Sequence, residues 1–303
     1  MTRAHFFLVW ILLFYSGITL AFKHYGNFSW VMSLKAVLIG LFGFEGGLVL
    51  NDYVDRKGDR LDIEGALTTY WRPFKSRPLP SGRISPNFAL GIFLLLSGLT
   101  GLLMFTLPYP NFIYVFFTML ASCIIEYFYQ VKRKNQTFPI AQLVGRMDFT
   151  LFPVAGYLCY GRPDNLILLY LLFFYPWTLA HLAVNDFIDT ENDWARGIKS
   201  IPVLYGTQWT LLWILGFTLI HYFTASIFLK QLGATAHYGF LLGFLVLGFA
   251  NYKLIRKKVR KQACLHFYST MFHSCSTLSR LSLTLSSNLL LHIDRFNFFF
   301  CRA

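Results

Sequence analysis

Two acidic segments with the same pattern lie 134 positions apart in the chain. The first is Asn51-Asp-Tyr-Val-Asp-Arg-Lys-Gly-Asp59 and the second is Asn185-Asp-Phe-Ile-Asp-Thr-Glu-Asn-Asp193. Each has Asn, Asp, an aromatic, a β-branched residue and Asp in that order, with a third Asp four positions later. Carboxylates at this spacing share one face of an α-helix, so each segment is expected to direct three of them to one point. Residues 51–59 and 185–193 are the first and second acidic motifs.

Carboxylates in this arrangement suit Mg²⁺, which prefers oxygen ligands and is usually held by one or two carboxylates together with phosphate oxygens. The expected metal ligands and catalytic residues are the six aspartates Asp52, Asp55, Asp59, Asp186, Asp189 and Asp193. The amides of Asn51 and Asn185 could add neutral oxygens or hold these carboxylates in place. A lone acidic cluster often only ends a helix, but two matched motifs, each followed by basic residues, favour Mg²⁺ and a diphosphate.

The elements that carry the motifs are expected to be membrane-spanning helices. The chain of 303 residues is 55% hydrophobic and only 14% charged, with a mean hydropathy of +0.50, which is too apolar for an ordinary soluble domain. A helix needs about 20 apolar residues to cross a bilayer. Eight such spans are predicted: His5–Ala21, Trp30–Leu50, Phe88–Leu107, Asn111–Tyr129, Phe138–Tyr160, Asn165–Val184, Trp209–Leu229 and His237–Leu254. The predicted fold is all-α, a polytopic transmembrane helical bundle.

The distribution of basic residues predicts the orientation of this bundle. Connections after even-numbered spans are rich in Lys and Arg, whereas each connection after an odd-numbered span holds at most one. Because Lys and Arg concentrate on the cytoplasmic side, both acidic motifs are expected to face the cytoplasm, with the protein in the cell inner membrane. The same rule explains most of the net charge of +13, so the expected partners are membrane lipids and not nucleic acid.

The repeated motif divides the chain into parts. Residues 1–262 are predicted to form one membrane domain with pseudo-repeat halves of about 1–160 and 161–262, in which the motifs face each other across a central cavity. Residues 263–303 differ in character, because they are rich in Ser, Thr, Leu and Phe and show neither a clean apolar span nor a helical stripe. This tail is expected to be disordered or to reflect an altered reading frame.

Polar and basic residues beside the motifs are the candidates for holding a diphosphate, since guanidinium groups bind phosphate oxygens bidentately and ammonium groups act as point charges. The candidates are Asn51, Arg56, Lys57, Arg77, Tyr129, Lys132, Arg133, Asn185 and Lys199. Arg196 also follows the second motif. The hydroxyl of Tyr129 could contact the phosphate or stabilise the cation formed when it leaves. Contact with lipid headgroups is the alternative for the basic residues.

Five ionisable residues fall inside the predicted spans: Glu45, Glu126, Arg146, Asp148 and His181. Such residues are unfavourable in a bilayer unless they are paired. We expect Arg146 to pair with Glu45 or Asp148, and any of the five could orient an acceptor.

Further segments follow each motif in matching order. They are Arg77-Pro-Leu-Pro-Ser-Gly-Arg83 after the first, and Gly197-Ile-Lys-Ser200 with Leu204-Tyr-Gly206 after the second. With the motifs, they resemble the UbiA superfamily of intramembrane prenyltransferases, especially the 4-hydroxybenzoate polyprenyltransferases, from about Trp30 to Tyr252. The resemblance implies typically nine helices around a cavity, Asp-rich loops at its cytoplasmic mouth, and Mg²⁺-dependent transfer of a prenyl group from a prenyl diphosphate to a small aromatic or other lipid-precursor acceptor, with release of diphosphate.

The chain departs from the family pattern at three places. The stretch from Asp59 to Arg77 is longer, and no ninth helix is recognisable in the tail. Where members show Tyr-x-x-x-Lys, either Arg133 takes the place of the lysine or Lys132 acts from a shifted register. The atypical tail leaves a non-catalytic binder of prenyl diphosphate as one alternative. A cation transporter is another, and it should carry its acids at mid-membrane. The acceptor, the prenyl chain length and the oligomeric state stay open.

Overall fold

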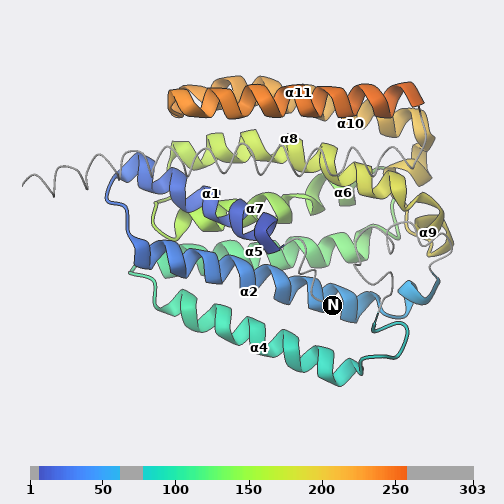
Figure 1. Ribbon diagram of the computed structural model, residues 1–303. Helices are drawn as coiled ribbons and strands as arrows, with labels where there is room; N and C mark the ends of the chain where they lie inside the picture. The colour runs from blue at the N-terminus through green and yellow to red at the C-terminus, as the bar shows by residue number, and fades with distance from the viewer. Residues whose placement is uncertain (1–6, 62–77, 258–303) are drawn as a thin grey trace, which may run out of the picture.

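The computed structural model describes residues 7–61 and 78–257, and these form a bundle of helices (Figure 1). The long helices are α1 (Phe7–Tyr25), α2 (Trp30–Asp55), α4 (Pro86–Phe105), α5 (Asn111–Lys132), α8 (Asn165–Ile188), α10 (Ile201–Phe228) and α11 (Ala234–Lys257). Shorter elements are η2 (Gly58–Leu61), α6 (Ile140–Gly145), α7 (Met147–Leu158), α9 (Thr190–Ala195) and η3 (Leu229–Gln231). Within the described ranges there is no strand, and the predicted all-α fold is confirmed.

Six of the described helices are long and apolar enough to cross a membrane: α2, α4, α5, α8, α10 with η3, and α11. The two other predicted spans correspond to α1 and to the pair α6 and α7. The predicted span 138–160 is not one continuous helix, because α6 ends at Gly145 and α7 begins at Met147, with Arg146 between them. Eight is therefore an approximate count of the spans.

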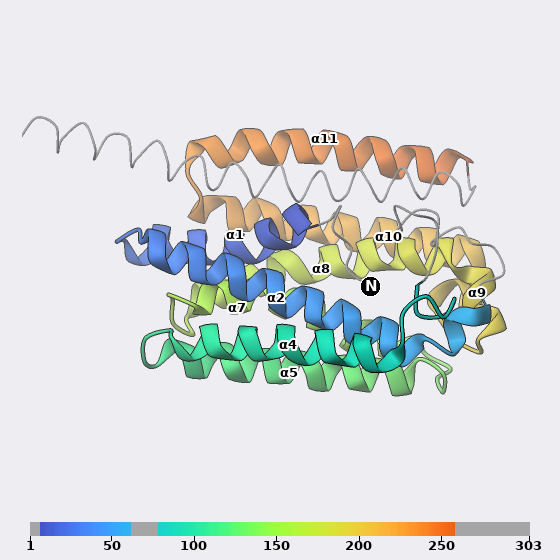
Figure 2. The same cartoon turned by 60° about the horizontal axis from the view of Figure 1, so that its bottom comes forward.

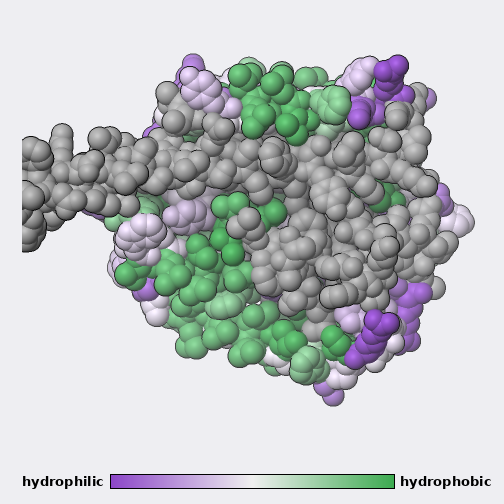
Figure 3. Space-filling model, viewed as in Figure 1, coloured by the Kyte–Doolittle hydropathy of each residue, from purple (hydrophilic) through white to green (hydrophobic). Residues whose placement is uncertain are grey.

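Helix α8 is the best-buried of the six candidate spans. Of its apolar segment 67% is buried, compared with 17% for α4 and 11% for α5. It packs on α10 and α7, while α2 packs on α4 and α1. The surface over α2 and α4 is broadly hydrophobic in the space-filling view, with hydrophilic residues at the ends of the helices (Figure 3). Exposed apolar side chains of this kind are what lipid contact requires, as expected for an integral membrane protein.

Glycines allow α1 and α7 to pack backbone against backbone. A Cβ on Gly17 would overlap the carbonyl oxygen of Pro153, and a Cβ on Gly156 would overlap the carbonyl oxygen of Phe14. Small residues at such positions are the common means by which transmembrane helices approach closely. These contacts hold α1 against α7, which comes from the middle of the sequence.

Local capping explains where two of the spans begin. Ser85 accepts a hydrogen bond from the backbone N–H of Phe88 at 3.2 Å, and Pro86 occupies the first turn of α4. Asp164 accepts from the N–H of Ile167 at 3.0 Å at the start of α8. A side-chain acceptor at the N-cap and a proline in the first turn both favour helix initiation.

The two acidic motifs lie at the same end of the bundle. The first begins in the last turns of α2 and continues into η2, and the second begins in the last turn of α8 and continues into α9. In both ribbon views η2 and α9 are at the right-hand end of the molecule (Figures 1 and 2). Helices α2 and α8 therefore bring the two motifs to the same end of the bundle.

Candidate functional site

Each acidic motif spans a break between two helices. The break follows Asp55 in the first motif, so that Asp59 lies in η2, and it falls at Asp189 in the second, so that Asp193 lies in α9. The backbone of Asp189, with φ −94° and ψ 15°, has left the α-helical region. The prediction that each motif places all three carboxylates on one face of one helix is therefore wrong, and the carboxylates are presented by a helix end and the turn beyond it.

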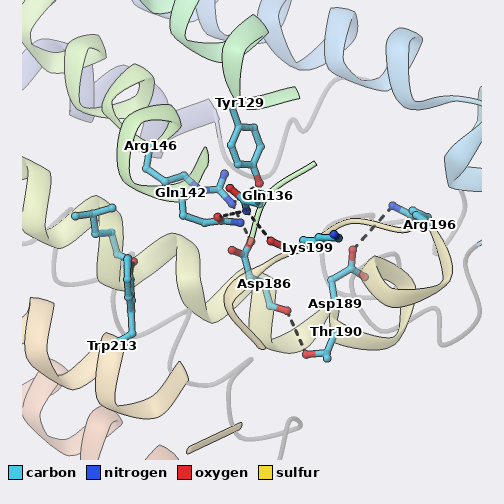
Figure 4. A network of polar contacts seen from close by, with 11 residues as sticks. Tyr129, Gln136, Gln142, Arg146, Asp186, Asp189, Thr190, Arg196, Lys199 and Trp213 are labelled. Atoms are coloured by element: carbon cyan, nitrogen blue, oxygen red, sulfur yellow. Dashed lines mark hydrogen bonds and ion pairs between the residues drawn. The ribbon is translucent and has the colours of Figure 1, made fainter. Parts of the chain in front are cut away.

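Arg196 contacts both motifs, and Figure 4 shows its contact with Asp189 of the second. Its Nη1 lies 3.3 Å from Oδ1 of Asp59 in the first motif and 4.0 Å from Oδ2 of Asp189 in the second. Asn192 holds Asp189 from the other side, since its amide donates to Oδ1 at 2.7 Å. One guanidinium group therefore reaches a carboxylate of each motif.

Arg133 connects the end of α5 to the first motif. Its Nη2 donates to Oδ1 of Asp55 at 3.0 Å, and its Cζ lies 5.4 Å from the centre of the Tyr129 ring. The neighbouring Lys132 is half-buried and forms no ion pair with the described part of the chain. Of the two residues that could stand for the family lysine, Arg133 is therefore the one directed at the acidic motifs.

Arg146 connects the break between α6 and α7 to the second motif. Its Nη2 donates to Oδ1 of Asp186 and to the hydroxyl of Tyr129, each at 2.8 Å, and its Cζ lies 4.3 Å from the centre of the tyrosine ring. The prediction that it pairs with Glu45 or Asp148 is wrong, because the break turns the side chain toward the end of α8. The intramembrane arginine is thus part of the acidic site.

Gln136 is a residue of the site that sequence reasoning missed. Its Nε2 donates to the carbonyl oxygen of Lys199 at 2.7 Å and to Oε1 of Gln142 at 2.8 Å, while its own Oε1 accepts from the N–H of Ala141 at 2.9 Å. It is buried, so these bonds satisfy its amide. No local pattern marks it, since Lys199 lies 63 positions away in sequence.

Gly197 turns the chain at the end of α9. It adopts a φ of +67°, and the N–H of Ile198 donates to the carbonyl oxygen of Asp193 at 2.8 Å, as in a Schellman motif. The next N–H, of Lys199, donates to the carbonyl oxygen of Arg133 at 2.8 Å. This turn therefore ties the segment after the second motif to the end of α5.

The other candidate residues make fewer contacts with the acidic motifs. Arg56 folds back over the ring of Tyr53, with Cζ 4.3 Å from the ring centre. Lys57 is exposed and Asn51 is half-buried at the end of α2. Arg77 lies outside the described residues, as does the tail from residue 258 onward.

The charge distribution of the second motif favours a bound cation. Burial raises the pKa of the Asp193 carboxyl well above its usual range, and the carboxylates of Asp186 and Asp189 raise it further. Oδ2 of Asp186 and Oδ1 of Asn185 are buried, and neither accepts a hydrogen bond of normal geometry from the described residues. Buried oxygens of this kind are the ligands that Mg²⁺ prefers.

The carboxylates do not form a metal cage by themselves. Among the described residues no group of three or more His, Cys, Asp or Glu side chains converges closely enough to hold a metal ion. Mg²⁺ usually takes one or two carboxylates and completes its shell with water and phosphate oxygens. The donor set therefore fits Mg²⁺ shared between the motifs and a diphosphate.

These features define a class, a helical integral membrane protein with two facing aspartate motifs at one end of its bundle. The chain belongs to the UbiA prenyltransferase family, whose sequence profile matches residues 8–276.

Two curated relatives show the range of the family. A 4-hydroxybenzoate octaprenyltransferase of Psychrobacter arcticus is 28% identical over 221 residues, which cover 70% of this chain and 65% of the relative. A digeranylgeranylglyceryl phosphate synthase of Methanobrevibacter smithii is 34% identical over 186 residues, which cover 58% of this chain and 59% of the relative. The chain thus spans less than two thirds of the length of these relatives.

A solved structure supports the fold. A UbiA homologue from Archaeoglobus fulgidus, bound to DMAPP and Mg²⁺, matches with a TM-score of 0.59 at 16% sequence identity. The match covers 91% of this chain and 97% of that one. At this identity the likeness concerns the fold alone.

Proposed function

We propose that this protein transfers a prenyl group from a prenyl diphosphate to an acceptor within the membrane and releases diphosphate, in a reaction that requires Mg²⁺. The observation that carries the proposal is the contact of Arg196 with both Asp59 and Asp189, which makes the two motifs one site. The names of the family and its relatives, and the DMAPP and Mg²⁺ bound to the A. fulgidus homologue, support the reaction class.

The residues that would hold the metal are the aspartates of the two motifs, Asp52, Asp55, Asp59, Asp186, Asp189 and Asp193. Bound Mg²⁺ would supply positive charge beside the diphosphate oxygens and so stabilise the leaving group. Asn51 and Asn185 are proposed to support this shell, and the buried, unbonded Oδ1 of Asn185 is consistent with that role.

The basic residues are proposed to neutralise the diphosphate. Arg133 and Lys199 are held together by the bond between the Lys199 N–H and the Arg133 carbonyl, so their side chains start close to each other beside the acidic motifs. Lys132, Arg56, Lys57 and Arg77 are proposed to add positive charge around it. Paired guanidinium and ammonium groups of this kind bind phosphate oxygens well.

Tyr129 is proposed to donate to the leaving diphosphate. Because its hydroxyl oxygen accepts from Arg146 at 2.8 Å, the hydroxyl hydrogen remains available to an anion. The adjacent guanidinium favours negative charge near this oxygen. A hydroxyl held in this way can stabilise charge that develops as the allylic carbon–oxygen bond breaks.

The acceptor is proposed to be an aromatic or another lipid precursor that reaches the site from the membrane. One relative is named for 4-hydroxybenzoate, and another is named as the synthase of a digeranylgeranylglyceryl phosphate. The apolar helices that carry the motifs are proposed to keep water from the site, which would protect an allylic cation until the acceptor attacks it. The basic connections favour a site on the cytoplasmic side of the inner membrane.

The test is prenyl transfer by the purified protein in lipid nanodiscs. Labelled prenyl diphosphate is supplied with 4-hydroxybenzoate or with a glyceryl phosphate, and both prenylated product and diphosphate are measured. EDTA and the double variant Asp52→Asn, Asp186→Asn are expected to abolish transfer, and added Mg²⁺ is expected to restore only the EDTA-treated protein. Glu191→Gln, a change in the same segment but outside the matched aspartate spacing, is the control and is expected to remain active.

Turnover by the double variant at the wild-type rate would exclude the proposed metal site. Binding of prenyl diphosphate with no release of diphosphate, for every acceptor supplied, would favour a non-catalytic binder.

A further inference from the structure

The guanidinium of Arg196 is only partly used by its neighbours. Nη1 contacts Asp59 and Asp189, whereas Nε and Nη2 are buried and have no hydrogen-bond partner among the described residues. The side chain is 12% exposed. Buried guanidinium donors without partners are unfavourable. We therefore expect Nε and Nη2 of Arg196 to form hydrogen bonds in another state of the protein.

The position of Arg196 allows such a change. The residue is the C-cap of α9, where its backbone N–H donates to the carbonyl oxygen of Asn192 at 3.0 Å. Its side chain passes over Gly58, and its Cδ would lie 3.9 Å from a Cβ at that glycine. The backbone of Arg196 is thus fixed, while the guanidinium sits in the gap between the two motifs at the end of a flexible stem.

Arg196 lies between two carboxylates, a position that favours a positive charge. Carboxylate oxygens of Asp59 and Asp189 face it from the two motifs, and their side chains are 8% and 13% exposed. Carboxylates gathered in a buried site are destabilised by mutual repulsion unless a positive charge lies between them. In the protein without metal, the guanidinium supplies that charge.

We propose that Arg196 is a positioning residue with two states. Without Mg²⁺ it holds the two motifs together, and when Mg²⁺ takes the carboxylates of Asp59 and Asp189 its guanidinium turns to the diphosphate, which then satisfies Nε and Nη2. This inference rests on the proposed function, because it requires that Mg²⁺ binds these carboxylates.

The two states predict effects of opposite sign for one substitution. Mg²⁺ alone must displace the guanidinium, so Arg196→Gln is expected to bind Mg²⁺ more tightly than the wild type. Pyrophosphate, used as the probe in saturating Mg²⁺, gains the guanidinium contacts, so Arg196→Gln is expected to bind it more weakly. A change of about tenfold in each direction corresponds to about 1.4 kcal/mol. A side chain that only stabilised the fold would not move the two affinities in opposite directions.

The first measurement compares the wild type with Arg196→Gln in detergent micelles by calorimetric titration and by thermal unfolding. In EDTA the midpoint of Arg196→Gln is expected to lie about 2–4 °C below that of the wild type, and in saturating Mg²⁺ the difference is expected to vanish. Arg60→Gln is the matched control, because Arg60 is exposed at the same end and carries the same charge. It is expected to leave both affinities and the midpoint unchanged.

The second measurement uses the wild-type protein, so that it does not depend on the folding of a variant. Arg196 is modified with an arginine-selective reagent and its modified fraction is read by mass spectrometry. Modification is expected to be slow in EDTA, faster with Mg²⁺ alone, and slow again with Mg²⁺ and pyrophosphate. Equal rates in all three conditions would overturn the two-state role.

The outcomes separate this inference from the proposed function. If Mg²⁺ with pyrophosphate fails to stabilise even the wild type, the metal site itself is wrong. If the wild type binds both, and Arg196→Gln shows the same Mg²⁺ affinity, pyrophosphate affinity and EDTA midpoint, the metal site stands and the role of Arg196 is wrong.

Discussion

Arg146 donates to Asp186 at 2.8 Å, and the same Nη2 also donates to the hydroxyl of Tyr129. The two residues come from different parts of the bundle, the break between α6 and α7 and the last turn of α8. The Arg146 and Asp186 side chains are 16% and 8% exposed, so neither charge is well solvated. The ion pair therefore fixes the first carboxylate of the second motif and leaves only its Oδ2 for a ligand.

Replacement of Arg146 by methionine is expected to destabilise the protein strongly. Asp186 would be left as a buried charge without its partner, which typically costs about 3–5 kcal/mol. The measurement is the free energy of unfolding in detergent. The double variant Arg146→Met, Asp186→Leu is expected to regain most of the loss, because a buried pair replaced by apolar residues is often near neutral. A double variant that is less stable than Arg146→Met would contradict this account.

Replacement of Tyr129 by phenylalanine tests the hydroxyl separately from the ring. The ring beside Arg146 is kept, while one hydrogen bond to a charged group, worth about 1.5–3 kcal/mol, is lost. Prenyl transfer is expected to fall about a hundredfold if the hydroxyl stabilises the leaving group. Tyr127→Phe on the same helix is the control, since Tyr127 is 73% exposed, and it should transfer at the wild-type rate. Equal rates for the two variants would remove Tyr129 from the reaction.

Replacement of Gly197 by alanine is expected to strain the turn after α9. The φ of +67° places a Cβ against the following carbonyl, which costs about 1–2 kcal/mol. Because this turn positions Lys199 beside Arg133, the KM for prenyl diphosphate should rise as the thermal midpoint falls. Gly216→Ala is the control, since that glycine is inside α10 and a Cβ on it meets nothing within 4 Å. If the thermal midpoint fell for Gly216→Ala and not for Gly197→Ala, the conclusion that the turn at Gly197 requires glycine would be wrong.

Replacement of Gly156 by alanine is expected to separate α1 from α7. The added methyl overlaps the carbonyl oxygen of Phe14, and overpacking of this kind costs about 1–3 kcal/mol. The thermal midpoint should fall, while the KM of the protein that remains folded should stay unchanged because the contact is remote from the acidic motifs. Gly98→Ala in α4, where a Cβ meets nothing within 4 Å, should leave both unchanged.

The placement of the motifs could be predicted from the sequence because apolar length fixes where a span ends. The predicted spans Trp30–Leu50 and Asn165–Val184 stop directly before the motifs. In the structure α2 continues to Asp55 and α8 to Ile188, so the first polar residues of each motif form the last turn of a helix. Hydropathy cannot show that turn, since polar residues at a membrane surface are compatible with helix and with loop.

The pairings within the site could not be predicted from the sequence. Arg146 and Asp186 are 40 positions apart, and Arg133 and Asp55 are 78 apart. These contacts depend on which helices pack against each other. The hydrophobic periodicity of the sequence does not show which helices become neighbours. The break at Arg146 has only a weak sequence signal, because Val-Gly-Arg-Met contains no proline and an isolated glycine is tolerated inside a helix.

The glycine contact between α1 and α7 has a consequence for the synthesis and membrane insertion of the protein. About 120 residues separate the end of α1 from the start of α7. At a synthesis rate of about 5–20 residues per second, the glycine face of α1 waits roughly 6–24 s in the bilayer before its partner emerges from the ribosome. The glycine face of α1 is therefore expected to be covered by lipid, by α2 or by the insertion machinery until α7 has been made.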